Sequence, residues 1–253
     1  MTTGPVPLAV DADSLALAAD ALRNGAVVAV PTDTVYGLAA DPHQPRAIER
    51  LFALKERPTS VALPVLVAGR DQLSAVCGPL GRAAEHLAGR FWPGPLTLVV
   101  PRRRSFTADL GGPPSARQTV GVRWPDHPVI ESLCRRLGPL AVTSANRHGS
   151  APATGAGQVA EIFSGEEGLA LILDGGVCQG IPSTVVECRG PAIRSLREGA
   201  IPWADLLEGS RDDPRPVGSV SQGPGAAAPV SVPSGNADRG VTGNSLPPSA
   251  TIA

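Results

Sequence analysis

Apolar residues occur along the chain in two spacings, one typical of amphipathic helices and one typical of buried strands. Apolar side chains three and four positions apart predict helices at residues 14–24, 45–54, 80–91, 129–137, 158–163 and 202–207. Short apolar runs predict strands at 27–30, 63–67, 96–100, 119–123, 140–143, 169–173, 184–187 and 193–196. This alternation predicts a single α/β domain, a twisted mixed sheet with flanking helices.

The first of these strands ends at Pro31, which has no N–H group to continue a sheet. Thr32, Asp33 and Thr34 follow at the expected sheet edge, before residues 35–38 return to apolar character. Their short polar side chains can hold one another and still offer hydroxyls to a ligand. A capped turn that binds nothing is an equally good interpretation of this stretch taken alone.

Composition divides the chain near residue 208. Residues 209–253 are rich in Gly, Pro and Ser, contain no aromatic residue and carry charges that cancel. Such a segment cannot bury enough apolar surface to offset its ordering entropy, so we expect a disordered tail there. Residues 1–208 remain for one well-buried domain. Within it, the long connection at 102–117 contains Gly-Gly-Pro-Pro and is expected to be a mobile loop.

Charge and cysteine content narrow the class of protein. A net charge of −1 excludes a global basic field for nucleic acid, although a local basic cleft is compatible with it. Cys77, Cys134, Cys178 and Cys188 lack a C-x-x-C spacing, and neither a signal peptide nor an apolar run of membrane length occurs. We therefore expect a reduced cytoplasmic protein with four buried thiols and no membrane contact. The four histidines are too scattered for a metal cage, so a metal would arrive with a substrate.

Two familiar catalytic signatures do not apply. No P-loop sequence is present, and the G-x-G-x-x-A match that begins at Gly155 does not follow a strand, which favours a loop and helix start. Asp126, His127 and Ser144 could form a triad, but no G-x-S-x-G elbow surrounds the serine. We interpret that combination as chance.

Cations and hydroxyls recur where predicted helices and strands end. The cations are Lys55, Arg57, Arg123 and Arg197, and the hydroxyls are Thr32, Thr34, Thr119, Thr143, Ser144, Ser183 and Thr184. Each alone is better explained as a solvated charge or a turn cap. Their joint recurrence favours a site for an anionic substrate, because ligands of open α/β sheets collect at strand ends.

Several motifs, taken together, resemble those of YrdC-like (TsaC) proteins, from the first helix to about Leu207. They are Pro31-Thr32-Asp33-Thr34-Val35-Tyr36-Gly37-Leu38, Lys55-Glu56-Arg57, Phe91-Trp92-Pro93-Gly94-Pro95-Leu96-Thr97, Val120-Gly121-Val122-Arg123, Thr143-Ser144-Ala145-Asn146, Asp174-Gly175-Gly176 and Ser183-Thr184-Val185-Val186. The resemblance implies a YrdC-like fold and makes residues 1–208 the catalytic domain.

The resemblance also implies an activity, that of an L-threonylcarbamoyladenylate synthase. Such an enzyme forms threonylcarbamoyl-AMP and pyrophosphate from L-threonine, bicarbonate and ATP, with Mg²⁺ entering together with ATP. The product would pass to downstream tRNA threonylcarbamoyl-transfer proteins, and a weak RNA contact is expected. The alternative is an RNA-binding YrdC-like protein without synthase activity, although few aromatic residues are present for base stacking.

The resemblance assigns roles to individual residues. It implies catalytic roles for Lys55 and Arg57, which with Thr119, Ser144, Asn146 and Arg197 would bind ATP. It implies a threonine pocket made of Thr32, Thr34, Arg123, Thr143 and Ser183. One departure is that Val61 and Ala62 stand where many relatives carry Lys-Pro, so one cation near the substrates is missing.

Overall fold

The computed structural model describes residues 4–208, so the tail expected at 209–253 lies outside the described residues. The α-helices are α1 (Ala12–Arg23), α2 (Pro45–Lys55), α3 (Arg70–Val76), α4 (Arg82–Phe91), α5 (Pro128–Leu137), α6 (Ala156–Ile162) and α7 (Trp203–Glu208), and a 3-10 helix η1 covers Pro114–Gln118. The strands are β1 (Pro7–Ala9), β2 (Val27–Val30), β3 (Gly37–Ala40), β4 (Val65–Leu66), β5 (Leu96–Pro101), β6 (Thr119–Arg123), β7 (Leu140–Ser144), β8 (Leu169–Asp174), β9 (Thr184–Arg189) and β10 (Ala192–Arg197).

The predicted α/β class is confirmed, because these strands form one mixed sheet in the order β1-β8-β2-β3-β7-β4-β6-β5-β9-β10. Every predicted helix and strand is present, with ends that differ by at most about two residues, and the strand at 63–67 loses most length because it shortens to Val65–Leu66. The pattern missed β1, β3 and α3. Strand β3 reads Gly-Leu-Ala-Ala, which has little strand propensity and is held by its neighbours β2 and β7.

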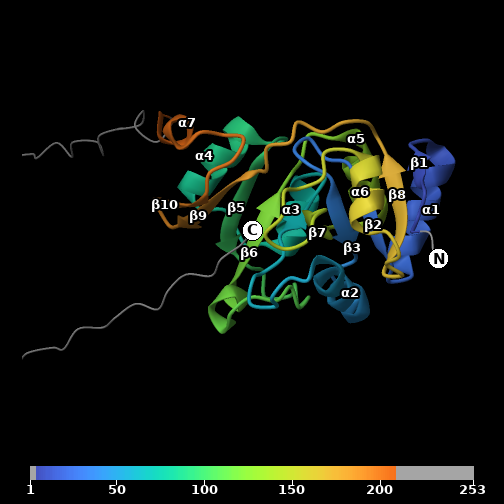
Figure 1. Cartoon of the computed structure of the whole chain (residues 1–253). Helices are drawn as coiled ribbons and strands as arrows, with labels where there is room; N and C mark the ends of the chain where they lie inside the picture. Colours follow the sequence, from blue (N-terminus) through green and yellow to red (C-terminus); the bar gives the residue numbers. More distant parts are fainter. Residues whose placement is uncertain (1–3, 209–253) are drawn as a thin grey trace, which may run out of the picture.

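Helices cover the two faces of the sheet unequally (Figure 1). On one face, α1 and α5 pack over β2, β3 and β7 in a core that includes Leu22, Ile130 and Val142. On the other face, α2, α3, α4 and α6 contribute Leu51, Leu73, Leu87 and Val159 to the larger core. In Figure 1, α1 and α5 lie toward the β1 and β8 end of the sheet, whereas β9 and β10 lie at the opposite end.

Arg123, one residue of the candidate site, lies on the first face of the sheet. Leu66 of β4 belongs to the core beneath α1 and α5, and its register partner in β6 is Arg123. Register partners point to the same face of a sheet, so Arg123 extends from that face beyond the two helices. Because β4 has only two residues, the strand between β6 and β7 is short at this point.

The strand ends that carry the predicted residues do not all lie at one edge of the sheet. Strand β6 is parallel to β4, and β4 is antiparallel to β7, so β6 and β7 run in opposite directions. Their carboxyl ends, which carry Arg123 and Ser144, therefore lie at opposite edges of the sheet. The predicted residues come together instead because long side chains such as that of Arg123 reach across the sheet to the β2–β3 connection.

Other local expectations have mixed outcomes. Gly155 directly precedes α6, as the loop and helix start required, and the Nδ1 atom of His127 caps α5 by accepting from Val129 N. The loop at 102–117 is tied to its surroundings, since Leu63 N donates to Leu110 O and Gly112 N donates to Thr59 O, and it ends in η1. The expectation of four buried thiols is wrong for Cys178, which is partly exposed.

Candidate functional site

A small cavity of about 60 Å³ opens on the sheet beside β4, and most of the predicted site residues border it. Its lining comes from the ends of β5, β6, β7, β9 and β10 and from the β2–β3 connection. The polar lining residues are Thr32, Thr34, Thr97, Arg123, Thr143, Ser144, Ser183 and Arg197. Lys55 and Arg57 join this group through hydrogen bonds to Ser144 and Thr143.

Lys55, the last residue of α2, is held by neutral oxygens. Its side chain is 3% exposed, and its ammonium donates to Ser144 O at 2.7 Å and to Ser144 Oγ at 3.1 Å. It also contacts Asn146 Oδ1 at 2.5 Å and Asn146 O at 3.3 Å. Within the described residues, no carboxylate bonds this ammonium. The charge is therefore buried without an anion beside it, and the last residue of β7 and the turn after it provide every acceptor.

Glu56 lets Lys55 and Arg57 point into the same site. Successive residues of a helix point about 100° apart, so continued helix would separate the two cations. Glu56 instead has a φ of 51°, and among the described residues it is the one non-glycine residue in the left-handed region. The chain turns there, and Arg57 donates from Nη1 to Thr143 Oγ1 at 3.3 Å and from Nη2 to Ala62 O at 3.0 Å.

Arg123 organises the residues that follow β2. Its Nε donates to Gly94 O at 3.0 Å, Nη1 to Thr34 Oγ1 at 3.0 Å and Nη2 to Asp33 Oδ1 at 2.5 Å. Thr32 Oγ1 lies 3.0 Å from Thr34 Oγ1, so the two hydroxyls hold each other as the sequence predicted. The second carboxylate oxygen of Asp33 is buried without a hydrogen-bond partner among the described residues. Arg123 therefore joins the β2–β3 connection to β6 across the sheet.

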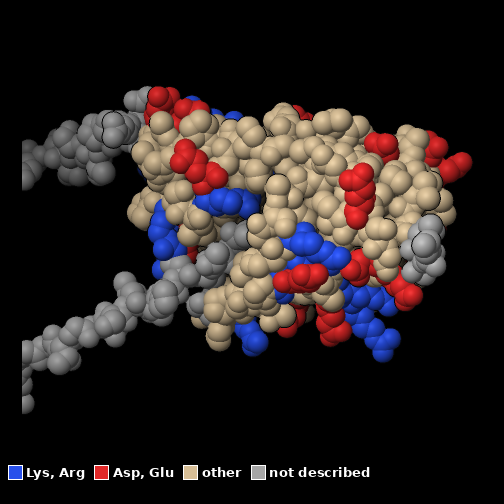
Figure 2. All heavy atoms as spheres, viewed as in Figure 1, with Lys and Arg blue, Asp and Glu red and all other residues tan. Residues whose placement is uncertain are grey.

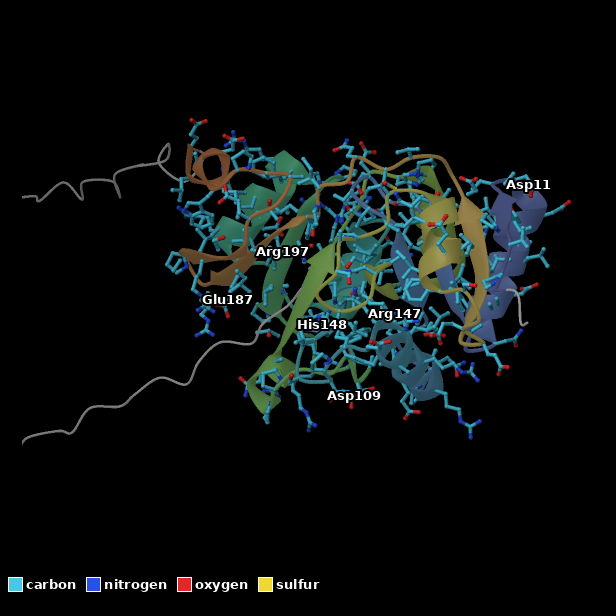
Figure 3. All side chains as sticks on the ribbon, in the orientation of Figure 1. Asp11, Asp109, Arg147, His148, Glu187 and Arg197 are labelled. Carbon is cyan, nitrogen blue, oxygen red and sulfur yellow. The ribbon has the colours of Figure 1, made fainter. Side chains whose placement is uncertain are left out.

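Arg197 and Ser183 form the opposite wall. The Nη2 atom of Arg197 donates to Ser183 O at 2.8 Å and contacts Ser183 Oγ at 3.1 Å. The Ser183 hydroxyl also lies 2.9 Å from the hydroxyl of Thr97, which is buried. In Figure 3, Arg197 lies on the β10 side, away from the labelled residues Arg147 and His148. The cavity thus lies between the α2 side and the β9–β10 side of the fold.

The cations of the site repel one another, and this repulsion lowers the pKa of several of them. Burial, together with the charges of Arg57 and Arg197, lowers the pKa of Lys55 to about 7. Burial and the charge of Arg197 lower the pKa of Arg57 to about 10, and burial and the charge of Arg123 lower the pKa of Arg197. Burial also lowers the pKa of Arg123, while Asp33 opposes this effect. Such a cluster favours the binding of an anion with several negative oxygens.

One predicted site residue lies away from this group. Thr119 begins β6 opposite Pro101, at the far end of the strand from Arg123, and it does not line the cavity. Asn146 is buried and reaches the group through Lys55. The roles that the resemblance assigned to all of these residues stay predictions.

The structure adds residues that the sequence prediction did not include. Asp33 was placed beside the two threonines without a role of its own, and Thr97 was quoted only within a motif. The strand alternation around Leu96 and Leu98 could have shown that Thr97 faces the other way. A further signal is that Lys55 is the only lysine of the 253-residue chain, which otherwise uses arginine.

Neither a resident metal site nor a spanning helix is found in residues 4–208. No group of three or more His, Cys, Asp or Glu side chains there is arranged to hold a metal ion. None of the helices there has the length and apolar character required to cross a membrane. In the space-filling view, basic atoms form several separate groups among acidic and uncharged atoms, so this face carries no continuous basic surface (Figure 2).

Comparison with known proteins gives a consistent result. The model of the Sua5/YciO/YrdC family, described as Telomere recombination, matches residues 20–199. A threonylcarbamoyl-AMP synthase of Pyrococcus abyssi is 38% identical over 192 residues, which are 75% of this chain and 55% of the relative. A threonylcarbamoyl-AMP synthase of Bacillus subtilis is 39% identical over 194 residues, which are 74% of this chain and 54% of the relative. The chain thus spans about half the length of these curated relatives.

A solved structure supports the same relationship. The crystal structure of P. abyssi Sua5 complexed with L-threonine matches with a TM-score of 0.73 and 34% sequence identity. The match covers 80% of this chain and 60% of that chain. The bound L-threonine is a property of that protein, and the match shows that the two chains share a fold.

The left-handed conformation of Glu56 leads to a stability prediction. Glu56→Gly should raise the free energy of unfolding by about 0.5–1 kcal/mol, because glycine adopts this conformation without the Cβ clash. The ion pair between Glu56 and Arg147 offsets little of this gain, since the Glu56 side chain is 69% exposed. The measurement is the urea midpoint.

Glu56→Ala is the matched control for this prediction. It removes the same carboxylate but keeps a Cβ atom, so it should show no gain. A Glu56→Gly protein that is less stable than Glu56→Ala would show that the backbone conformation is not the cause.

Proposed function

The chain belongs to the Sua5/YciO/YrdC family, and on that premise we propose that it is an L-threonylcarbamoyladenylate synthase. It would form threonylcarbamoyl-AMP and pyrophosphate from L-threonine, bicarbonate and ATP, for the modification of tRNA. The observation that carries the proposal is a group of four cations at one cavity. Arg123 and Arg197 line it, and Lys55 and Arg57 reach it through Ser144 and Thr143; all but the half-buried Arg197 are buried. The names of the relatives support the same reaction.

In the proposed reaction, the threonine amine takes up carbon dioxide from bicarbonate, which forms a carbamate and releases water. A carbamate oxygen then attacks the α-phosphorus of ATP, the bond to the β-phosphate oxygen breaks, and pyrophosphate leaves. The protein would act mainly by positioning and by neutralising charge. Lys55, Arg57 and Arg197 would hold the phosphates, and the paired hydrogen-bond donors of each guanidinium suit phosphate oxygens.

Threonine would bind on the Arg123 side. The Arg123 guanidinium has five N–H groups and uses three in the described contacts, so two N–H groups could meet the amino-acid carboxylate. The hydroxyls of Thr34, Thr143 and Ser183 would surround the threonine side chain. A pocket with such groups rejects an analogue that lacks the hydroxyl, because its own polar atoms would stay unpaired.

We propose that ATP enters as its Mg²⁺ complex, with the ion on phosphate oxygens and water. The described residues support this view, because the cavity is lined by hydroxyls and cations and its nearby carboxylate, Asp33, is engaged by Arg123. The cavity is too small for a whole nucleotide, so we propose that the nucleoside lies outside its opening. The labile product would then pass to a tRNA threonylcarbamoyl-transfer protein.

The direct test is pyrophosphate release by the purified full-length chain. Release from Mg²⁺ and ATP should require both threonine and bicarbonate, and serine and valine should be poorer substrates than threonine. The assay is run with each of the twenty amino acids. Absence of release with threonine under all conditions would exclude the proposed reaction for this chain.

A second prediction concerns protons. At pH 8 most Lys55 amines in the free protein are neutral, because the pKa is about 7. A bound triphosphate favours the charged form, so ATP binding should take up about one proton per site and should weaken as the pH rises above 7. Isothermal titration in two buffers of different ionisation enthalpy measures this uptake.

Lys55→Arg is the matched variant for the proton measurement, because arginine keeps its charge at pH 8. It should bind ATP with almost no proton uptake. Equal uptake by wild type and Lys55→Arg would show that Lys55 does not change its protonation state on binding.

A second cavity supports the alternative function, RNA binding without synthesis. An open cavity of about 800 Å³ lies inside the loop between β5 and β6. Its lining includes Arg102, Arg103, Arg104 and Arg117, and none of these forms an ion pair among the described residues. Arginines of this kind suit a phosphate backbone, and such a contact could also accompany synthase activity.

RNA binding at this loop predicts a steep dependence on salt. Arg104→Gln with Arg117→Gln should remove two phosphate contacts and flatten the slope of log affinity against log salt by about 1.4–1.8 in a filter-binding assay. Arg82→Gln with Arg136→Gln, at exposed helix positions, should leave the slope unchanged. Salt-independent RNA binding, or equal effects of the two pairs, would count against this alternative.

A further inference from the structure

The end of α2, where Lys55 lies, is held by the turn that follows β7. The carbonyl groups of the last residues of a helix lack partners within the helix and need them elsewhere. Leu54 O accepts from Arg147 Nη1 at 2.7 Å, and Lys55 O accepts from His148 N at 2.8 Å. Two consecutive residues of one turn therefore donate hydrogen bonds to two consecutive carbonyl groups at the end of α2. Figure 3 shows Arg147 and His148 side by side next to α2.

Arg147 makes further contacts outside the cavity. Its guanidinium pairs with Glu166 at 2.5 Å and with Glu56 at 3.2 Å, and it lies over the ring of Phe163 at 5.3 Å from the centroid. Phe163 is fully buried beneath it. A cation at the carbonyl end of a helix also interacts favourably with the helix dipole. With a side chain that is 27% exposed, Arg147 is fixed between α2 and the connection after α6.

The same turn, together with Ser144 at the end of β7, provides the oxygen cage that surrounds the Lys55 ammonium. Asn146 and Ser144 bond the ammonium, and Asn146 Nδ2 donates to Arg147 O at 3.0 Å and to Ser150 O at 2.5 Å. Both ends of Lys55 are thus attached to this turn, its carbonyl through His148 and its ammonium through Asn146. The distance between α2 and the turn determines whether the cage closes around the ammonium.

We propose that Arg147 is a positioning residue for Lys55, which keeps the turn after β7 docked on the end of α2 and so holds the ammonium where it meets an anionic substrate. The assignment of that substrate to ATP rests on the proposed function, but the positioning itself does not. Arg147 touches neither the cavity nor the other site cations in the described contacts. Its effect on the cavity would pass through the end of α2 and the turn after β7.

The competing explanation is that Arg147 contributes only to stability, as many surface ion pairs do, and weakly. The two explanations differ in what happens to the Lys55 ammonium. If the turn loosens, water reaches the ammonium and its pKa rises toward the ordinary value of 10.5. If Arg147 is only a surface cation, the pKa of Lys55 stays close to 7.

The test uses the fact that Lys55 is the only lysine. Lysine labelled with ¹³C at Cε gives one side-chain signal in the full chain, and its pH titration reports the pKa of Lys55 without activity or assignment. Arg147→Gln should raise that pKa to above about 8 and weaken ATP binding about tenfold, with threonine binding changed less than about twofold. Arg147→Lys keeps the charge but not the several contacts, so it should recover part of both effects.

Glu166→Gln separates docking from simple electrostatics. Loss of a nearby anion acts through space to lower the pKa of a lysine, whereas loosening of the turn raises it. We expect a rise. This variant also serves where Arg147→Gln does not fold.

Arg90→Gln is the matched control. Arg90 likewise donates to a main-chain carbonyl, Asp205 O, and lies over an aromatic ring, that of Phe91, but on α4. It should leave the pKa of Lys55 and ATP binding unchanged. An unchanged or lower pKa of Lys55 in Glu166→Gln would overturn the proposal, even if melting temperatures fell, because loss of the Arg147 charge could by itself raise that pKa in Arg147→Gln. Absence of pyrophosphate release with a raised pKa would instead reject the synthase reaction and keep the positioning role.

Discussion

A buried ammonium group held by neutral oxygens is the constraint on which this site depends. Lys55 is almost fully buried, and Ser144 and Asn146 provide the atoms that bond it within the described residues. Burying a charge in this way is costly unless its hydrogen bonds are made with good geometry. The end of α2 and the turn after β7 must therefore be held at a fixed distance from each other, so that these hydrogen bonds can form. The left-handed turn at Glu56 and the contacts of Arg147 and His148 keep the two segments together.

The same arrangement explains why the site is suited to an anion. Arg57 and Arg197 both lower the pKa of Lys55, and Arg123 lowers that of Arg197, so the substrate-free site holds mutual repulsion. An anion with several oxygens removes that repulsion when it binds. The repulsion lowers the stability of the free protein, and a bound anion restores that stability in the complex. Functional sites commonly show this compromise. The Asp33–Arg123 pair keeps one cation compensated and so divides the site into two unequal parts.

The fold could be predicted largely from apolar spacing, because α2, β2, β5 and β6 have the periodicities of their final structures. Strand β3 could not, since its Gly-Leu-Ala-Ala sequence is held by β2 and β7. For the site, residue types at element ends indicated which cations and hydroxyls gather around the cavity, but not how they come together. Arg123 and Ser144 end strands that run in opposite directions, and the reach of Arg123 to Thr34 brings the two regions together. Whether a side chain can make such a contact depends on the order of the strands in the sheet, and the local pattern of apolar residues does not reveal that order.

The departure at Val61 and Ala62 has less effect on the site than the sequence alone suggested. Arg57 Nε donates to Val61 O at 3.2 Å, and Arg57 Nη2 donates to Ala62 O at 3.0 Å. Both acceptors are main-chain carbonyls, which any residue at these positions supplies. The small Ala62 side chain also packs with Ala116, Val99 and Val185 in a separate apolar cluster over the sheet. A lysine at this point would add one more cation near three that already repel one another. Its absence therefore leaves the support of Arg57 intact and lowers the electrostatic cost of the substrate-free site.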